Sequence, residues 1–165
     1  MYSGDLRIRP VREADLPIFF QHQQDPEAAF MAAFTAEDPA NLEAFLTHWH
    51  RLLQSNTVMK RSILSAGEVV GHIASWMEDD RTEVTYWIAR DHWGRGVATA
   101  ALSLFLRGID TRPIYARVAE DNAGSIRVLE KCGFVVVDKD RGFANARGEL
   151  IDELLLRLDA TERSR

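Results

Sequence analysis

The chain has 165 residues and a formal net charge of −5, with 46% hydrophobic and 27% charged residues. These values fit one folded domain with a full hydrophobic core, exclude extended disorder, and argue against a general nucleic-acid binder, whose affinity needs a basic surface. One cysteine excludes an internal disulfide and a thiolate metal cluster. The longest apolar run, residues 97–106, is too short to cross a bilayer, and the N-terminus lacks a signal-peptide pattern. We therefore expect a cytoplasmic protein without a membrane partner.

The first part of the chain predicts one strand and one short helix. Residues 6–9 alternate between apolar and basic side chains and stop at Pro10, which is typical of a short strand. Residues 13–23 predict a helix in which Pro17 is tolerated only in the first turn. Residues 25–37 mix proline, alanine and aromatic residues, and we interpret them as a loop or a broken helix.

A longer helix is predicted between residues 38 and 56. Asp38 is the expected N-cap, Pro39 suits the first helical position, and Asn56 is the expected stop. One apolar stripe at three- and four-residue spacing should face the core; it consists of Leu42, Phe45, Leu46, Trp49, Leu52 and Leu53.

The middle of the chain predicts a meander of three strands. They cover residues 58–64, 69–77 and 82–88 and are separated by polar turns. Gly71 lies inside the second of these strands, where a glycine indicates either a β-bulge or a close approach of another backbone segment.

The last part of the chain alternates helices and strands. Helices are predicted over 96–107 and 124–131, a strand over 113–118, and two final strands over 134–137 and 150–158, joined by a polar loop over 140–148. The order β-α-α-β-β-β-α-β-α-β-β predicts an α/β (α+β) fold, with a mixed, mostly antiparallel sheet of about seven strands and four helices on both faces. We expect a single domain over residues 1–158 and a frayed tail over residues 159–165.

A glycine-rich segment follows the third strand of the meander and opens the next helix; its sequence is Trp93-Gly94-Arg95-Gly96-Val97-Ala98-Thr99. Glycines allow a tight turn and a close approach to a ligand, and the first amides of a helix have no partner within it. With the helix dipole they form a site for a phosphate or pyrophosphate, the alternative being a plain turn. The segment lacks the ending of a Walker loop. It is also a poor dinucleotide fingerprint, because three strands precede it.

A second motif follows the strand at 113–118. Its pattern, Asn-x-x-Ser and then Glu-Lys-x-Gly-Phe, is matched by Asn122, Ser125, Glu130, Lys131, Gly133 and Phe134. With both motifs present, the chain resembles the GNAT superfamily of acyl-coenzyme A N-acyltransferases. The strand Glu83–Ile88 looks like the branch that contains the ribosomal-protein N-terminal acetyltransferases, the Rim-type enzymes. The resemblance implies the GNAT fold from end to end of the chain.

The resemblance also implies acetyl-coenzyme A as the co-substrate, with the amides of residues 95–99 holding its pyrophosphate. The backbone of Ile88 and Arg90 would pair with the pantetheine arm as an extra strand does, inside a V-shaped split between the fourth and fifth strands. Asn122 would contact the arm near the thioester, and arginine side chains would supply positive charge. The expected coenzyme-binding residues are Ile88, Arg90, Trp93, Gly94, Arg95, Gly96, Val97, Ala98, Thr99, Asn122, Ser125 and Arg127.

The family reaction is a direct attack of a primary amine on the thioester, and the amine must first lose a proton to a base. Glu83 is the expected base, because the family often keeps a carboxylate on the strand that ends at the coenzyme loop; a surface position on the sheet is the alternative. Many relatives protonate the leaving thiolate with a tyrosine at the position that Leu129 occupies here. Ser125 is therefore the expected hydrogen-bond donor to the departing sulfur, with helix capping as the alternative.

The sequence leaves the acceptor open between a protein N-terminus and a small amine such as an amino sugar or a polyamine. Some Rim-type enzymes carry a carboxylate base between the last two strands, but residues 143–147 contain none. Phe30 and Phe34 lie in the segment that often walls the acceptor site in this family. We expect them to bind the acceptor, to contact a second copy of the chain in a homodimer, or to pack internally.

No metal site is expected, because His48 and His50 point in different directions on a helix and no third ligand is near. Cys132 is expected to be a small buried hydrophobe. The sequence thus predicts an N-acetyltransferase that uses acetyl-coenzyme A and no metal. Three alternatives stay open: transfer of another acyl group such as succinyl, a non-catalytic module that senses acyl-coenzyme A, and a nucleotide-binding protein that uses the glycine-rich loop.

Overall fold

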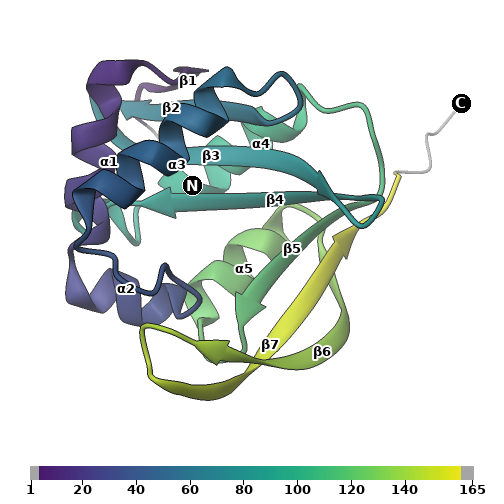
Figure 1. Ribbon diagram of the computed structural model, residues 1–165. Coiled ribbons are helices and arrows are strands. Elements are labelled where there is room, and N and C mark those ends of the chain that lie inside the picture. Colours follow the sequence, from purple (N-terminus) through teal and green to yellow (C-terminus); the bar gives the residue numbers. More distant parts are fainter. Residues whose placement is uncertain (1–3, 161–165) are drawn as a thin grey trace, which may run out of the picture.

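The computed structural model describes residues 4–160 and shows one central sheet with helices on both faces (Figure 1). Its strands are β1 (Leu6–Pro10), β2 (Met59–Ser65), β3 (Glu68–Glu78), β4 (Arg81–Ile88), β5 (Ile114–Ala119), β6 (Val135–Ala144) and β7 (Glu149–Leu158). They lie in the order β1-β2-β3-β4-β5-β7-β6. Neighbouring strands are antiparallel except β4 and β5, which are parallel. The predicted mixed, mostly antiparallel sheet of seven strands is confirmed.

Five helices cover this sheet within residues 4–160: α1 (Leu16–Gln23), α2 (Pro26–Ala32), α3 (Leu42–Gln54), α4 (Val97–Leu106) and α5 (Ala123–Lys131). The helices α1 and α3 lie over one face, and α4 and α5 lie over the other (Figure 1). The sequence predicts only four helices, because α2 falls in the segment interpreted as a loop or a broken helix. Asp25 starts α2 by accepting a hydrogen bond from the Ala28 N–H at 2.8 Å, and Pro26 fills the first helical position.

Two neighbouring residues of β3 show how the layers pack. The ring of His72 lies 4.7 Å from the ring of Phe19 in α1 and 5.1 Å from that of Trp49 in α3. Ile73 points to the opposite face and is fully buried in the larger core, which includes Leu102 of α4. The apolar stripe predicted for α3 therefore faces the sheet, with Trp49 as its buried centre, except at Leu42 in the first turn, which is exposed.

The start of α3 differs from the prediction. Asn41, not Asp38, is the N-cap, and its Oδ1 accepts a hydrogen bond from the Ala44 N–H at 3.0 Å. The Pro39 carbonyl instead accepts a hydrogen bond from Gln24 at 2.9 Å. The predicted cap was wrong because this contact with the segment before α2 holds the residues around Pro39 in a turn.

The strand β6 is longer than predicted. The sequence places its end at Val137 and a polar loop over 140–148, but β6 pairs with β7 as far as Ala144. It is the last strand of the sheet, so its polar residues face solvent while their backbone pairs with β7. Polarity alone was therefore a poor sign of a loop at this edge.

Both interpretations of Gly71 in β3, a close approach of another backbone segment and a β-bulge, are confirmed. A Cβ atom there would lie 2.2 Å from the Trp87 carbonyl oxygen in β4, so only glycine permits this close approach. The pairing of β2 with β3 also shifts between Ile63 and Leu64, next to Gly71, which is a β-bulge.

The parallel pair in the sheet is short. β4 and β5 pair only at Thr82 with Ile114 and at Glu83 with Tyr115, and the two strands then separate. This is the V-shaped split that the resemblance implies. No helix within residues 4–160 has the length and apolar character needed to cross a membrane. The predicted frayed tail lies, from residue 161 onward, outside the described residues.

Candidate active site

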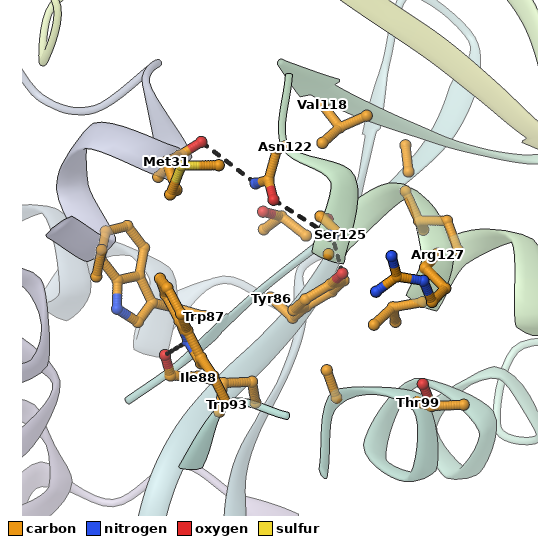
Figure 2. A pocket seen from close by; sticks show the side chains of 18 of the residues that line it. Met31, Tyr86, Trp87, Ile88, Trp93, Thr99, Val118, Asn122, Ser125 and Arg127 are labelled. Atoms are coloured by element: carbon orange, nitrogen blue, oxygen red, sulfur yellow. Dashed lines mark hydrogen bonds between the residues drawn. The ribbon is translucent and has the colours of Figure 1, made fainter. Parts of the chain in front are cut away.

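A cavity of about 950 Å³ opens where β4 and β5 separate. Its walls come from β4, β5, β7, α2, α4, α5 and the loop before α4, and Figure 2 shows it from close by. Of the residues that the sequence predicts to bind the coenzyme, all but one line this cavity: Ile88, Trp93, Gly94, Arg95, Gly96, Val97, Ala98, Thr99, Asn122, Ser125 and Arg127. The exception is Arg90.

The glycine-rich loop ends in an open helix N-terminus. Gly96 is the N-cap of α4 with φ +80°, a left-handed conformation that favours glycine, and no side chain caps the helix. The first backbone bond of the helix runs from the Ala100 N–H to the Gly96 carbonyl. The amides of residues 97–99 thus have no helical partner and are available to an anion, with the positive end of the helix dipole behind them.

Two arginines accompany these amides. Arg95 and Arg127 both line the cavity, and neither makes an ion pair with another of the residues 4–160. Figure 2 shows the Arg127 guanidinium pointing into the cavity. Unpaired guanidinium groups beside free helix amides suit phosphate groups. The residues present therefore fit the pyrophosphate end of coenzyme A.

The backbone of β4 is free on its cavity side. After Glu83, β4 keeps β3 as a partner on one side but has lost β5 on the other. Unpaired N–H and C=O groups along residues 84–88 can pair with an extended ligand as with an added strand. The Ile88 carbonyl also accepts a hydrogen bond from the Trp93 indole at 2.9 Å, which ties the loop to the end of β4 (Figure 2).

Arg90 is not among the residues that line the cavity, although the resemblance implies a backbone contact with the pantetheine arm and positive charge from its side chain. Its guanidinium forms ion pairs with Asp25 at 2.8 Å and with Glu27 at 3.4 Å. Both carboxylates belong to the beginning of α2, a helix that the sequence does not predict. Through these ion pairs, Arg90 connects α2 to the segment between β4 and α4.

Asn122 is occupied by two hydrogen bonds within the chain. Its Oδ1 accepts from the Ser125 N–H at 3.2 Å and so caps α5, and its Nδ2 donates to the Met31 carbonyl at 3.2 Å (Figure 2). Asn122, not Ser125, is therefore the cap of α5. Ser125 keeps its hydroxyl for the cavity, where its Oγ lies 2.7 Å from the Tyr86 hydroxyl oxygen.

The predicted base, Glu83, is not among the residues that line the cavity. Its side chain is in the closed part of the split, only 4% exposed, and accepts hydrogen bonds from Arg117 at 3.3 and 3.5 Å. Arg117 itself lines the cavity. The guanidinium of Arg117 thus pairs with the carboxylate on which the prediction rested.

Glu153 is a carboxylate of the cavity wall that the sequence analysis missed. It lies on β7 opposite Ala119 of β5, and within residues 4–160 it makes no side-chain hydrogen bond or ion pair. Burial raises the pKa of Glu153, Arg117 opposes that shift, and the charges of Asp140 and Glu83 add to it. The sequence signal was weak, because Glu153 is one of several charged residues in β7, and the pairing of β7 with β5, which is not adjacent to it in the chain, is what brings it to the cavity.

Of the two residues predicted to bind the acceptor, only Phe34 lines the cavity. Phe34 lines the cavity and packs against β6, where a Cβ on Gly142 would lie 3.2 Å from its ring. Phe30 does not line the cavity; it is 49% exposed, and its ring lies 4.1 Å below the guanidinium of Arg147. The segment between them is held by the β6–β7 turn, since the Ala146 N–H donates to the Ala33 carbonyl at 3.1 Å. The wall at this end is therefore built by α2, its following turn and the β6–β7 hairpin.

Within the described part of the chain, no three histidine, cysteine, aspartate or glutamate side chains are grouped as metal ligands would be. The polar groups that line the cavity are backbone amides, hydroxyls, arginines, Lys131, His92 and the carboxylates of Glu27, which is paired with Arg90, and Glu153, which is unpaired within residues 4–160.

This fold and this cavity are those of an acyl-coenzyme A acyltransferase, and the chain belongs to the GNAT acetyltransferase family: its residues 5–135 match the acetyltransferase (GNAT) domain. An N-acetyltransferase of Bacillus licheniformis, called p20 and described as uncharacterized, is 26% identical over 168 residues, covering 96% of this chain and 94% of the relative. The family predicted from the two motifs is confirmed.

Solved structures show the same fold. The spermidine N-acetyltransferase of Vibrio cholerae, in complex with CoA and spermine, matches with a TM-score of 0.81 at 18% identity, over 93% of this chain and 95% of that one. RimJ of Mycobacterium smegmatis, in complex with CoA-disulfide, matches with a TM-score of 0.77 at 24% identity, over 95% of this chain and 83% of that one. At these identities the likeness shows the fold alone.

Proposed function

We propose that this protein transfers an acetyl group from acetyl-coenzyme A to a primary amine by direct attack in a ternary complex. The observation that carries the proposal is the cavity in the β4–β5 split, lined by both an open helix N-terminus and the carboxylate of Glu153. An anion site and a proton acceptor in one cavity are what the two substrates of this reaction require.

The coenzyme would bind along the β4 side of the split. The amides of residues 97–99, with Arg95 and Arg127, suit the pyrophosphate, and the unpaired backbone of residues 84–88 suits the amides of the pantetheine arm. The relatives solved with CoA and with CoA-disulfide support this assignment for their shared fold.

The amine would enter from the side that Phe34 and Glu153 line. Its nitrogen attacks the carbonyl carbon, the carbon–sulfur bond breaks, and the sulfur leaves with the bonding electrons. The proton lost by the nitrogen needs an acceptor. Glu83 and Glu153 are the two carboxylates considered for this role, and the unpaired, cavity-lining position favours Glu153.

The acceptor is proposed as a class, a small-molecule amine or a protein N-terminus. One structural neighbour is named a spermidine N-acetyltransferase and another RimJ, so relatives of this fold include different acyltransferases. The homodimer and the cytoplasmic location stay predictions.

The first test is calorimetric titration with acetyl-coenzyme A, with ATP, NAD and succinyl-coenzyme A as controls. Saturable binding of acetyl-coenzyme A, with weak or no binding of ATP and NAD, is expected. Thiol release is then followed with spermidine, glucosamine and a short peptide with a free N-terminus. Binding without thiol release from any of these amines favours the non-catalytic sensor. Faster turnover with succinyl-coenzyme A than with acetyl-coenzyme A would show that succinyl is the transferred group. No binding of either thioester would overturn the proposal.

A further inference from the structure

Two hydroxyl groups from opposite walls of the cavity form a hydrogen bond with each other. The Tyr86 hydroxyl of β4 and the Ser125 hydroxyl of α5 lie 2.7 Å apart, and Figure 2 shows both side chains pointing to the same place. One helical turn beyond Ser125, Leu129 is only 1% exposed and offers no polar group. A tyrosine hydroxyl is thus present in the cavity, but it comes from β4 and reaches Ser125.

The direction of this hydrogen bond follows from chemistry. Within residues 4–160 neither hydroxyl has another hydrogen-bond partner, so each can donate or accept in this contact. Burial raises the pKa of Tyr86 to about 12, although the bond with Ser125 opposes the shift, so the phenol keeps its proton at neutral pH. A phenol is a stronger acid than an alcohol and therefore the better donor. We therefore expect the Tyr86 O–H to donate and the Ser125 Oγ to accept, which leaves the Ser125 proton for the cavity.

We propose that Tyr86 is a positioning residue that donates to Ser125 and so makes the Ser125 hydroxyl a directed, stronger donor to the sulfur of coenzyme A. The inference rests on the proposed function, because that function places the sulfur of coenzyme A next to Ser125. When the carbon–sulfur bond breaks, the sulfur takes the electron pair, and the Ser125 proton forms a hydrogen bond to it without leaving its oxygen. The thiolate is later protonated by solvent, and the amine proton goes to the carboxylate. Successive hydrogen bonds polarise one another, which is why the donor behind Ser125 matters.

The pKa of the bound coenzyme A thiol tests the inference without an acceptor amine. Coenzyme A labelled with ¹³C at the carbon next to sulfur is bound to each variant, and its NMR shift is followed with pH. Ser125→Ala should raise the thiol pKa by about one unit, because one hydrogen bond to a charged group is lost. Tyr86→Phe should raise it by about half a unit, since only the polarisation of Ser125 is lost. The double variant should match Ser125→Ala.

Tyr115→Phe is the matched control, because it removes a phenol hydroxyl from the neighbouring strand at a position outside the cavity lining. It should leave the thiol pKa unchanged. Calorimetry with coenzyme A shows beforehand that each variant binds. An unchanged thiol pKa in Tyr86→Phe overturns the role of Tyr86 but not the proposed function. A larger rise of the thiol pKa in the double variant than in Ser125→Ala has the same consequence. Failure of the unmodified protein to bind coenzyme A overturns the proposed function and this inference with it.

Discussion

At the residue scale, Gly96 has the most direct role in the proposed anion site. It has φ +80° and caps α4 with its bare backbone, so any side chain there is strained and would lie beside the first amides of the helix. Gly96→Glu adds a negative charge at the place proposed for the pyrophosphate. We expect the Kd for acetyl-coenzyme A, measured by calorimetry, to rise about 100-fold or more.

Gly67→Glu is the control for this substitution. Gly67 also has a positive φ of +83°, nothing lies within 4 Å of a Cβ placed there, and it is in the turn between β2 and β3. It carries the same backbone strain without the cavity. Retained affinity in Gly96→Glu, or equal losses in both variants, would contradict the assignment of the loop.

Substitutions of Glu153 and Glu83 distinguish the proposed catalytic carboxylate from a structural one. Glu153→Gln should lower kcat/KM for the amine about 100-fold and leave the Kd for acetyl-coenzyme A unchanged, because proton transfer is lost but the anion site is intact. Burial raises the pKa of Glu153, so the alkaline rise of the rate should begin above the usual range of a carboxylate and should disappear in the variant. Steady-state rates against pH measure both effects.

Glu83→Gln is the matched substitution in the same cluster. It breaks the pair with Arg117 but removes no group that lines the cavity, so a smaller loss of rate is expected. The rate should still rise with pH, but from a lower pH, because the charge of Glu83 raises the pKa of Glu153 and Arg117 lowers it. A larger loss in Glu83→Gln, together with a flattened profile, would restore Glu83 as the base.

At the element scale, the pairing of β3 with β4 depends on Gly71. A Cβ at this position would lie 2.2 Å from the Trp87 carbonyl oxygen and 3.2 Å from the Ile88 Cα, and both are backbone atoms that cannot turn away. Gly71→Ala should lower the free energy of unfolding by about 1–3 kcal/mol, the usual range for overpacking. Chemical denaturation measures this change.

Gly124→Ala offers the opposite case within α5. A Cβ there would meet only the Asn122 Oδ1, at 4.0 Å, and the position is helical. A gain of up to about 1 kcal/mol is expected from the lower entropy of the unfolded chain. If Gly71→Ala were as well tolerated as Gly124→Ala, the close approach of β3 to β4 would be wrong.

The elements that the sequence missed share one cause. The start of α3 and the existence of α2 depend on contacts between segments, such as the bond from Gln24 to the Pro39 carbonyl and the pairs of Arg90 with Asp25 and Glu27. The outer part of β6 is held by backbone pairing with β7, although its side chains are polar. Local propensity does not contain these terms, whereas the strong apolar stripe of α3 and the meander of β2, β3 and β4 are local and were predicted.

At the scale of the whole molecule, two buried polar groups make the fold sensitive to acid. Burial lowers the pKa of His72 from 6.5 to about 3, and His22 adds to the shift. The unfolded chain takes up a proton as the pH falls below about 6.5, but the folded chain does not until about pH 3. The free energy of unfolding should therefore fall as the pH decreases through this window. His72→Leu should flatten the decline, measured by denaturation at several pH values; an equally steep decline would contradict the unprotonated, buried ring.

Asp15 acts at lower pH by the same linkage. Burial alone would raise its pKa, but hydrogen bonds from Arg9, Ser62 and the Arg12 N–H lower it from 3.8 to about 2. The carboxylate thus stabilises the fold above about pH 4, and this contribution is lost as the pH falls toward 2. Asp15→Asn should reduce the stability at neutral pH and weaken the pH dependence between 4 and 2. Because Arg9 is in β1 and Ser62 is in β2, the loss would loosen the first edge of the sheet.

The sequence by itself determined the family and most of the sheet, and it located the proposed anion site. Those features are local: a glycine loop before a helix, the motif around Ser125, and runs of apolar residues at strand or helix spacing. Only the tertiary structure brings Glu153, the proposed proton acceptor, to the cavity, because β7 lies between β5 and β6. It also paired Glu83 with Arg117 and Tyr86 with Ser125 across segments 34 and 39 residues apart. Side-chain neighbours of this kind depend on strand order and register, which no local pattern encodes.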